Sequence, residues 1–316
     1  MKRHSLYLAP LRGITSHIFR TVYATHFDGI DLAVSPFVPT VKGRVVRRTH
    51  IRDLLPENNT VMPLIPQVIG NDPDTFIILA KCLAELGYTE INWNLGCPFP
   101  QVTKKKRGSG LLPFPDIIES FLDRVMPSLE IKLSIKVRLG LDSPTELHTL
   151  IPLFNAYPLS ELIIHPRTGA QLYRGCVDLE AFSECLCLCK HSVVYNGDIR
   201  RDDDFLKYSR RFPSVQSWMI GRGVIADPFL PYRIKNRDIN VPDKTRRLGR
   251  FHDDLFDHYS EAVDNRRHVL GIMKELWSLL AYSFPDTPNL LKNIRRIKTC
   301  DKYTEYMDDF FASCDT

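Results

Sequence analysis

The sequence lacks the features that would place the protein in a membrane or outside the cell. No apolar run approaches the ~18 consecutive residues that a membrane-spanning helix requires. The early apolar run Ser5–Ala9 is too short for a secretory signal, and Pro10 and Arg12 follow it closely. We therefore expect a cytoplasmic protein, in which the eight cysteines are reduced thiols rather than a disulfide framework.

Several ligand-binding motifs are also missing. The sequence has no paired CxxC motif of the kind that binds structural zinc, no Walker A loop, and no GxGxxG motif after the first expected strand. The segment Cys185–His191 resembles a metal-binding tract, but on a helix Cys187 would point away from the face shared by Cys185 and Cys189. We predict no metal site and interpret these cysteines as small buried hydrophobic residues, with metal binding as a remote alternative.

Positive charge is concentrated in four clusters, although the net charge of the chain is only +5. One basic cluster is usually a solvated surface. Four of them in a weakly basic protein favour a polyanionic partner such as nucleic acid. The stretch 301–315 is acidic overall, which argues against a basic tail that binds nucleic acid. The clusters span residues 42–52, 104–107, 244–250 and 292–298.

Short β-type segments alternate with amphipathic helical segments as far as Ile220. Two of the helical segments, Asp74–Leu86 and Asp116–Met126, begin with an aspartate suited to N-capping. Alternation that involves eight strands favours a (β/α)₈ TIM barrel, which is an α/β fold, over an open sheet. The expected strands are Ser5–Ala9, Ile30–Val34, Val61–Ile69, Thr89–Asn94, Ile131–Leu139, Glu161–His165, Ser192–Tyr195 and Gln216–Ile220.

After Ile220 the β-type segments stop and helical periodicity takes over. Helices are expected at Leu248–Val263, Val269–Ala281 and Leu290–Thr299, and the stretch Pro228–Pro242 joins them to the barrel. We therefore predict two domains, a catalytic TIM barrel over residues 1–240 and a small all-helical domain over residues 241–316.

The most informative local feature is a cysteine in a tight turn directly after the expected strand Thr89–Asn94. Apolar residues alternate with asparagines in this strand, which suits a strand whose second face lines a polar pocket. Gly96 permits an abrupt turn and Pro98 stiffens it, so the Cys97 thiol should be held in a fixed place. A thiol held in this way can act as a nucleophile, a metal ligand or a proton donor.

The expected strand Ile131–Leu139 carries its polar side chains on one face. Ser134, Lys136 and Arg138 share that face, and the apolar residues share the other. If the apolar face packs against the outer helices, Lys136 and Arg138 point into the barrel mouth, where two cations require an anionic or electron-rich ligand. The alternative is a strand at a sheet edge with its cations in water, which is less common for a parallel barrel strand flanked by helices.

Other polar residues follow the remaining strands at their carboxyl ends, where TIM barrels place their functional groups. Gln67 closes the third expected strand and His165 the sixth. The motifs Asn196–Asp198 and Gly221–Gly223 follow the seventh and eighth strands, where such barrels often bind phosphate with backbone N–H groups. Together, these two motifs indicate a phosphorylated cofactor or substrate.

Several of these motifs, in their order along the chain, also match one enzyme family. The matching segments are Leu8–Leu11, Asn94–Pro98 with Gly108–Leu112 beyond it, Lys136–Gly140, His165–Thr168, Asn196–Asp198 and Met219–Gly223. In these segments the chain resembles the bacterial tRNA-dihydrouridine synthases, flavin-dependent TIM-barrel enzymes with a helical C-terminal domain. The stretch His268–Arg295 is similar, more weakly, to the subfamily that modifies the D-loop at position sixteen.

The resemblance implies bound FMN, NADPH as the reductant, and reduction of the C5=C6 bond of a D-loop uridine in tRNA. It makes Cys97 the proton donor, while the flavin supplies hydride. We predict tRNA as the partner and no stable protein partner. The flavin-binding residues that the resemblance implies are Pro10, Leu11, Gln67, Lys136, His165, Asn196, Gly197, Asp198, Gly221 and Arg222. The substrate-binding residues are expected to be Asn94, Arg138, Arg167, Tyr173 and Arg295.

Two other functions compete with this one. An FMN-dependent reductase of a free pyrimidine or another small molecule would share the barrel, but it would need neither the basic clusters nor the helical C-terminal domain. A non-catalytic RNA-binding module that has kept the barrel would not need Cys97, Lys136 or the two phosphate motifs.

Overall fold

The computed structural model describes residues 4–41, 43, 45–236 and 241–314. Lys42 and Arg44 of the first basic cluster lie outside the described residues. The predicted domain boundary between residues 240 and 241 lies at the edge of another undescribed segment and stays a prediction. In the described part of the chain, no helix is both long enough and apolar enough to cross a membrane.

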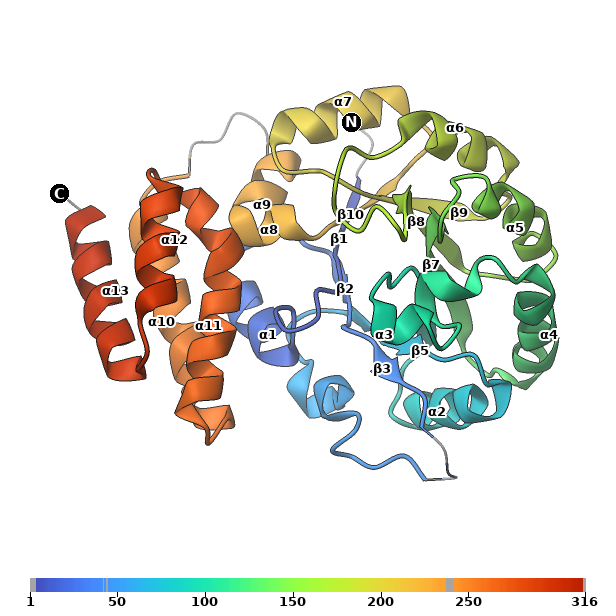
Figure 1. The fold of residues 1–316 in the computed structure, drawn as a ribbon, viewed down its shortest axis with the longest axis horizontal. Coiled ribbons are helices and arrows are strands. Elements are labelled where there is room, and N and C mark those ends of the chain that lie inside the picture. Colours follow the sequence, from blue (N-terminus) through green and yellow to red (C-terminus); the bar gives the residue numbers. More distant parts are fainter. Residues whose placement is uncertain (1–3, 42, 44, 237–240, 315–316) are drawn as a thin grey trace.

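The described residues form one sheet of ten parallel strands that curls into a barrel (Figure 1). The strand order is β3-β5-β6-β7-β8-β9-β10-β1-β2-β4. Only Pro66 separates β4, which pairs with β2, from β5, which pairs with β6, so the ring of strands closes there. The strands are β1 (Ser5–Leu8), β2 (Leu32–Val34), β3 (Val38–Pro39), β4 (Leu64–Ile65), β5 (Gln67–Ile69), β6 (Glu90–Leu95), β7 (Lys132–Gly140), β8 (Glu161–Thr168), β9 (Ser192–Asn196) and β10 (Ser217–Ile220). The predicted TIM barrel is confirmed.

The region between β2 and α2 differs most from the sequence-based prediction. The expected strand Val61–Ile69 begins only at Leu64 and is interrupted at Pro66, which has no N–H to donate to a neighbouring strand. The short strand β3 was not predicted. Between β3 and β4 the chain forms two 3₁₀ turns, η1 (Arg52–Leu54) and η2 (Pro56–Asn58), where a regular barrel would have an α-helix.

Helices cover the outside of the barrel (Figure 1). Asp72, rather than Asp74, caps α2, because its side chain accepts a hydrogen bond from the N–H of Thr75. Asp116 is not a cap either, since it lies within the first turn of α4. The helices are α1 (His17–His26), α2 (Pro73–Glu85), α3 (Pro100–Thr103), α4 (Pro115–Val125), α5 (Glu146–Phe154), α6 (Leu179–Leu188), α7 (Asp202–Arg211), α8 (Arg222–Ala226) and α9 (Leu230–Lys235), with 3₁₀ turns η3 (Gly108–Leu111) and η4 (Met126–Ser128).

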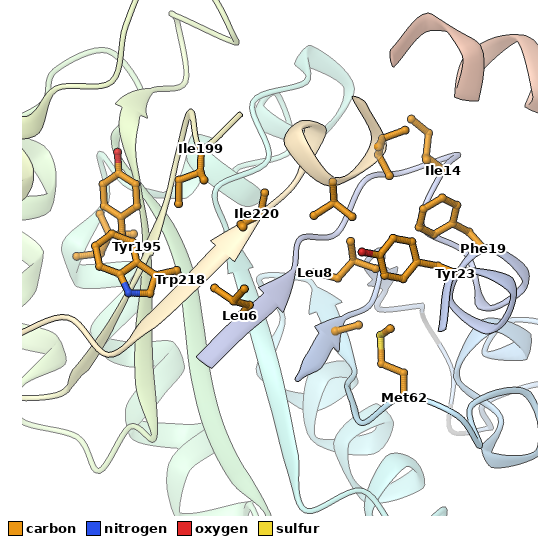
Figure 2. Close-up of a cluster of buried hydrophobic side chains, with 14 of the residues drawn as sticks. Leu6, Leu8, Ile14, Phe19, Tyr23, Met62, Tyr195, Ile199, Trp218 and Ile220 are labelled. Carbon is orange, nitrogen blue, oxygen red and sulfur yellow. The ribbon is translucent and has the colours of Figure 1, made fainter. Parts of the chain in front are cut away.

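The hydrophobic core has two parts because successive side chains of a strand point to opposite faces. Figure 2 shows the outer part, in which Leu8 of β1 lies beside Tyr23 of α1. The inner part fills the barrel. It consists of Tyr7, Ala9, Val34, Ile163, Val194 and Met219. The barrel is therefore a packed core and not a channel, as is usual for this fold.

Four further helices form a bundle against one side of the barrel (Figure 1). They are α10 (Lys244–Ala262), α11 (Arg266–Leu280), α12 (Thr287–Arg296) and α13 (Cys300–Cys314), with the 3₁₀ turn η5 (Ala281–Ser283). The bundle contacts α1 through Tyr259, whose hydroxyl lies 2.9 Å from Ser16 Oγ, and Arg247, which donates to the carbonyl of His26. The prediction missed α13, and the stretch Pro228–Pro242 is not only a linker, since it includes α9.

The interpretation of the three clustered cysteines as buried residues is correct for only one of them. Cys185 is buried on the inner face of α6, and Cys189 is half-buried beyond its end. Cys187 is exposed. In the described residues, no group of three or more metal-ligating side chains is arranged to hold a metal ion.

A half-buried acid, Glu161, lies at the amino end of the barrel. Glu161 Oε2 accepts a hydrogen bond of 3.1 Å from the Tyr7 hydroxyl, and its Oε1 has no partner in the described structure. Burial, with a smaller contribution from Glu90, raises the pKa of Glu161 from 4.5 to about 7. The folded state therefore holds a proton that the unfolded chain releases above pH 4.5, and stability falls as the pH rises from 4.5 to 7.

Glu161→Gln should remove this pH-dependent loss of stability. We expect the variant to match the wild type near pH 4 and to be more stable at pH 8 by on the order of 2 kcal/mol, or roughly 4 °C in Tm. Thermal unfolding at the two pH values measures this. Glu119→Gln, at an exposed position on α4, is the control and should change neither value. Equal effects of Glu161→Gln at both pH values would show that Glu161 does not titrate in this range.

Candidate active site

A cavity of about 720 Å³ opens at the carboxyl ends of the barrel strands. Its walls come from segments that follow β1, β2, β6, β8, β9 and β10, and from α11 of the helical bundle, which contributes Glu275 and Leu279. This volume is in the range of protein pockets that bind a cofactor or another small molecule. The position is the one at which TIM barrels carry out chemistry.

The cavity brings together most of the residues that the sequence singled out. Arg167 and Arg295 do not line it, since Arg167 is buried behind the wall and Arg295 lies on the surface of α12. The predicted residues that do line it are Pro10, Leu11, Gln67, Asn94, Cys97, Lys136, Arg138, His165, Tyr173, Asn196, Gly197, Asp198, Gly221 and Arg222.

Hydrogen bonds hold the turn that carries Cys97. Asn94 Oδ1 accepts from the N–H groups of Gly96 at 3.0 Å and Cys97 at 2.9 Å. The carbonyl of Cys97 accepts from both the N–H and the hydroxyl of Ser109. Gly108 has a φ of 58° and packs against the Cys97 backbone, where a Cβ atom would collide. The thiol is therefore fixed by its own turn and by the segment beyond it.

A chain of buried amides orients Asn94 itself. Asn94 Nδ2 donates to Gln67 Oε1 at 2.7 Å, and Gln67 Nε2 donates to Asn92 Oδ1 at 2.8 Å. Asn92 Nδ2 continues the chain to Ser134 Oγ at 3.0 Å. The chain joins β5, β6 and β7 beneath the cavity. Gln67 and Asn94 therefore position the thiol turn, in addition to any contact that they make with a ligand.

Cys97 is buried, with 7% of the residue exposed. Burial raises its pKa, although the N–H of Phe99 and the charges of Arg138, Arg12 and Lys136 act in the opposite direction. A thiol with a raised pKa is a poor nucleophile but still has a proton to give. Of the three roles left open by the sequence, the electrostatics favour proton donor.

Lys136 is a cation that faces the cavity without an acidic partner. No carboxylate among the described residues lies within 4.0 Å of its ammonium group. Burial, followed by repulsion from Arg138, lowers the pKa of Lys136 from 10.5 to about 7. A half-buried charge without a partner is costly unless a ligand compensates it, so Lys136 points to an electron-rich or anionic ligand.

Arg138 is held by backbone carbonyls. Its Nε donates to Gly96 O at 3.0 Å, and its Nη1 donates to Thr168 O at 2.7 Å and Leu172 O at 2.8 Å. Burial lowers its pKa from 12.5 to about 10, so it remains positively charged. The prediction that Lys136 and Arg138 point into the barrel mouth agrees with both residues lining the cavity.

The Tyr173 ring lies close to two guanidinium groups. Arg222 Cζ is 4.6 Å and Arg138 Cζ 5.4 Å from the ring centroid, both within cation–π range. His165 lies 6.4 Å from the same ring, centroid to centroid. Burial and the surrounding arginines and lysine lower the pKa of His165 well below its usual value, so it is a neutral hydrogen-bonding group.

Asp198 connects the two predicted phosphate motifs. It forms a bidentate pair with Arg167, at 2.6 and 3.1 Å, and lies 3.4 Å from Arg222 Nη2. Arg167 is 1% exposed and also donates to the carbonyl of Gly175. In this structure Arg167 holds Asp198 in place and is too buried to contact RNA. Gly197 lines the cavity with no room for a side chain, because a Cβ atom would lie 2.8 Å from Val177.

Several residues that line the cavity were not expected from the sequence. They include Arg12, Phe37, Phe99 and Glu275. Glu275 comes from the helical bundle and lies against Gly13, a contact between distant parts of the chain that no local pattern reveals. Phe99 follows Cys97 by two residues, so its proximity to the thiol was visible in the sequence.

Comparison with known proteins identifies the family of this chain. The model of the dihydrouridine synthase (Dus) family matches residues 7–312, which is nearly the whole chain. The chain belongs to the dihydrouridine synthase family. Membership supports, at the level of the family, an oxidoreductase that acts on uridine in tRNA.

The curated relatives named for position sixteen are similar along almost their full length, and another relative is similar over about two thirds of its length. The tRNA-dihydrouridine(16) synthase of Pseudomonas putida is 27% identical over 319 residues, which cover 95% of each chain. That of Neisseria meningitidis serogroup B is 25% identical and covers 98% of this chain and 95% of its own. A tRNA-dihydrouridine synthase B from Pasteurella multocida is 28% identical over 72% of this chain and 68% of its own.

Solved structures with the same fold are more distant in sequence. A 2-naphthoyl-CoA reductase in complex with 2-naphthoyl-CoA has a TM-score of 0.56 at 11% identity, covering 73% of this chain and 49% of that one. A morphinone reductase mutant in complex with tetrahydroNAD has a TM-score of 0.51 at 11% identity, covering 77% of this chain and 90% of that one. These similarities show the barrel fold.

Proposed function

We propose that the protein is a flavin-dependent tRNA-dihydrouridine synthase that uses NADPH to reduce the C5=C6 bond of a D-loop uridine. The observation that carries this proposal is the pairing, in one cavity, of a protonated buried thiol at Cys97 with an uncompensated cation at Lys136. Reduction of an alkene needs hydride at one carbon and a proton at the other. The thiol is suited to the second task and the cation to a flavin.

The residues of the cavity fit FMN. Gly197 and Gly221 line it where a Cβ atom would crowd Val177 or Ala9, which leaves backbone accessible to a phosphate at the ends of β9 and β10. Arg222 supplies a positive charge at this end, and Asp198 orients it. Lys136 is the candidate for the electron-rich pyrimidine edge of the ring. When bound, the flavin would pass hydride from the nicotinamide to the uracil.

The protein's own groups account for the remaining half of the reaction. Cys97 donates its proton to the carbon that does not receive hydride, and the thiolate that results is reprotonated from solvent before the next turnover. Overall, one uridine, one NADPH and one proton give one dihydrouridine and one NADP⁺. Asn94 and the backbone around Cys97 keep the sulfur in position throughout. Neutral His165 can hydrogen-bond to the ligand without adding charge.

RNA binding would use cations outside the cavity together with side chains that line it. A uridine in a folded loop must leave its stack to reach the thiol, which requires contacts to the flanking phosphates. Arg295 is exposed on α12, and Arg138 and Tyr173 line the cavity as candidates to contact the base. The relatives named for position sixteen, together with the full-length match, favour position sixteen as the target.

A reductase of a free small molecule remains the main alternative. The solved structures with this fold include reductases of small molecules, so the barrel alone does not decide between the two. The alternative gives no reason for Glu275 and Leu279 of the helical bundle to form part of the cavity wall. It also leaves the exposed cations of the bundle without a role.

Nucleoside mapping tests the proposal directly. In cells that lack this protein, tRNA digests analysed by mass spectrometry should lose dihydrouridine at one D-loop position, and the intact gene should restore it. Loss at position sixteen alone would support the narrower assignment. Unchanged dihydrouridine at every position would contradict the proposed function.

A further inference from the structure

An exposed aromatic side chain, Phe99, lies at the rim of the cavity with its ring uncovered. Of the large hydrophobic residues that are exposed in the described structure, only Phe99 and Tyr173 line this cavity. The Tyr173 ring is flanked by Arg138 and Arg222. In contrast, Phe99 is 47% exposed, and no other ring or cation of the described residues packs against it.

The backbone holds Phe99 rigidly beside the thiol. Phe99 lies between Pro98 and Pro100 and has extended dihedral angles, with φ −66° and ψ 134°, at the residue that precedes α3. Its N–H lies near enough to the Cys97 sulfur to act on the pKa of the thiol, so the ring projects from the same turn that carries the proton donor.

Unpaired cations follow Phe99 in the same segment. Lys104 and Lys105 come directly after α3 and are exposed, and no acidic side chain among the described residues pairs with either of them. The next lysine, Lys106, differs because its ammonium group lies over the Phe114 ring. Along the chain, the Cys97 thiol is thus followed by the flat apolar ring of Phe99 and then by the unpaired ammonium groups of Lys104 and Lys105. Single-stranded nucleic acid binds to surfaces of this kind by base stacking and phosphate contacts.

We propose that Phe99 stacks on the nucleobase next to the target uridine in the RNA strand, while Lys104 and Lys105 contact the backbone beyond it. This inference rests on the proposed function, because it requires an RNA substrate. A ring fixed at the rim would replace part of the stacking that the RNA loses when the target uridine turns into the cavity. Phe99 is therefore a substrate-positioning residue, and the proton still comes from Cys97.

The test removes the ring and the base separately and then together. Full-length tRNA transcripts are assembled by ligation with a normal base or an abasic ribose on the 5′ or 3′ side of the modified uridine. Their dissociation constants are measured with wild-type protein and with Phe99→Ala. Wild-type protein should bind the intact transcript about 10-fold more tightly than the transcript that lacks one of the two neighbouring bases. This factor is within the range known for stacked bases. Phe99→Ala should bind the intact transcript about 10-fold more weakly than the wild type does. It should bind the abasic transcript as tightly as the wild type binds that same transcript.

Two matched variants accompany Phe99→Ala. Phe99→Trp keeps a flat aromatic face and should restore the 10-fold preference for the neighbouring base. Tyr282→Ala removes an aromatic ring that is more exposed, at 65%, but lies in η5 outside the cavity, and it should behave like the wild type. Raising the salt concentration should weaken binding of all variants with the same slope, because none of them alters a cation.

The outcomes separate this inference from the function on which it rests. One outcome is that wild-type protein forms dihydrouridine in the intact transcript while the losses of affinity from Phe99→Ala and from the abasic site multiply, as for two independent contacts. That result would show that the stacking contact is wrong and would leave the proposed function standing. Unchanged affinity of Phe99→Ala for the intact transcript would overturn the stacking contact as well. Wild-type protein that forms no dihydrouridine would overturn both.

Discussion

Cys97→Ala is expected to lower the rate of dihydrouridine formation by about 10²–10⁴-fold, the usual contribution of a positioned general acid. The flavin should stay bound, because the thiol lies at the turn after β6 and the predicted phosphate-binding residues follow β9 and β10. Single-turnover assays with unmodified tRNA measure the rate, and the visible spectrum of the protein measures its flavin content.

A second cysteine provides the control for this variant. Cys176 is exposed and does not line the cavity, so Cys176→Ala should retain the wild-type rate. The pKa of the Cys97 thiol is raised above its usual value, so the wild-type rate should not fall as the pH rises through ~8.5. Cys97→Ala with wild-type activity would mean that another group protonates the base.

Lys136→Met should have the second-largest effect, about 10²-fold on turnover, because it removes a preorganised charge from the cavity. It should also make the midpoint potential of the bound flavin more negative, since the cation favours the more negatively charged reduced state. Lys132→Met is the matched control, because Lys132 lies on the same strand, β7, but is exposed at its opposite end. Equal potentials in wild type and Lys136→Met would place the cation away from the flavin.

The lowered pKa of Lys136 also predicts a pH dependence of FMN binding. In the free protein this pKa is about 7, so above pH 7 an anionic ligand must bind together with a proton. FMN affinity should therefore fall as the pH rises from 7 to 9, by at most tenfold per unit. Titration of apoprotein with FMN measures this, and in Lys136→Met the slope should disappear. A slope that persists in the variant would assign the proton to another group.

The sequence predicted those parts of the site that depend on local chain geometry. The Cys97 turn was predictable because its strand, glycine and proline are contiguous in the chain. Lys136 and Arg138 were predictable because alternation along one strand sets which face a side chain occupies. The barrel followed from the alternation of strands and helices, although the break at Pro66 was missed even though proline disrupts strands.

Other parts of the site depend on contacts between residues that are distant in the sequence. The pairing of Arg167 with Asp198 turns an expected RNA contact into a buried support, and nothing near either residue indicates it. Glu275 reaches the cavity only because α11 packs near the barrel mouth. Phe99 was overlooked for a different reason, since an aromatic residue in a sequence is usually assigned to the core.

Anaerobic reoxidation of the flavin tests most directly the claim that the cavity serves tRNA. The purified flavoprotein is reduced with one equivalent of NADPH, mixed with tRNA from cells that lack the protein, and followed by its visible flavin absorbance. We expect tRNA to restore the absorbance and to gain dihydrouridine in equal amount, while free uridine and uracil restore it far more slowly. Rapid reoxidation by a free pyrimidine, with none by tRNA, would contradict the account.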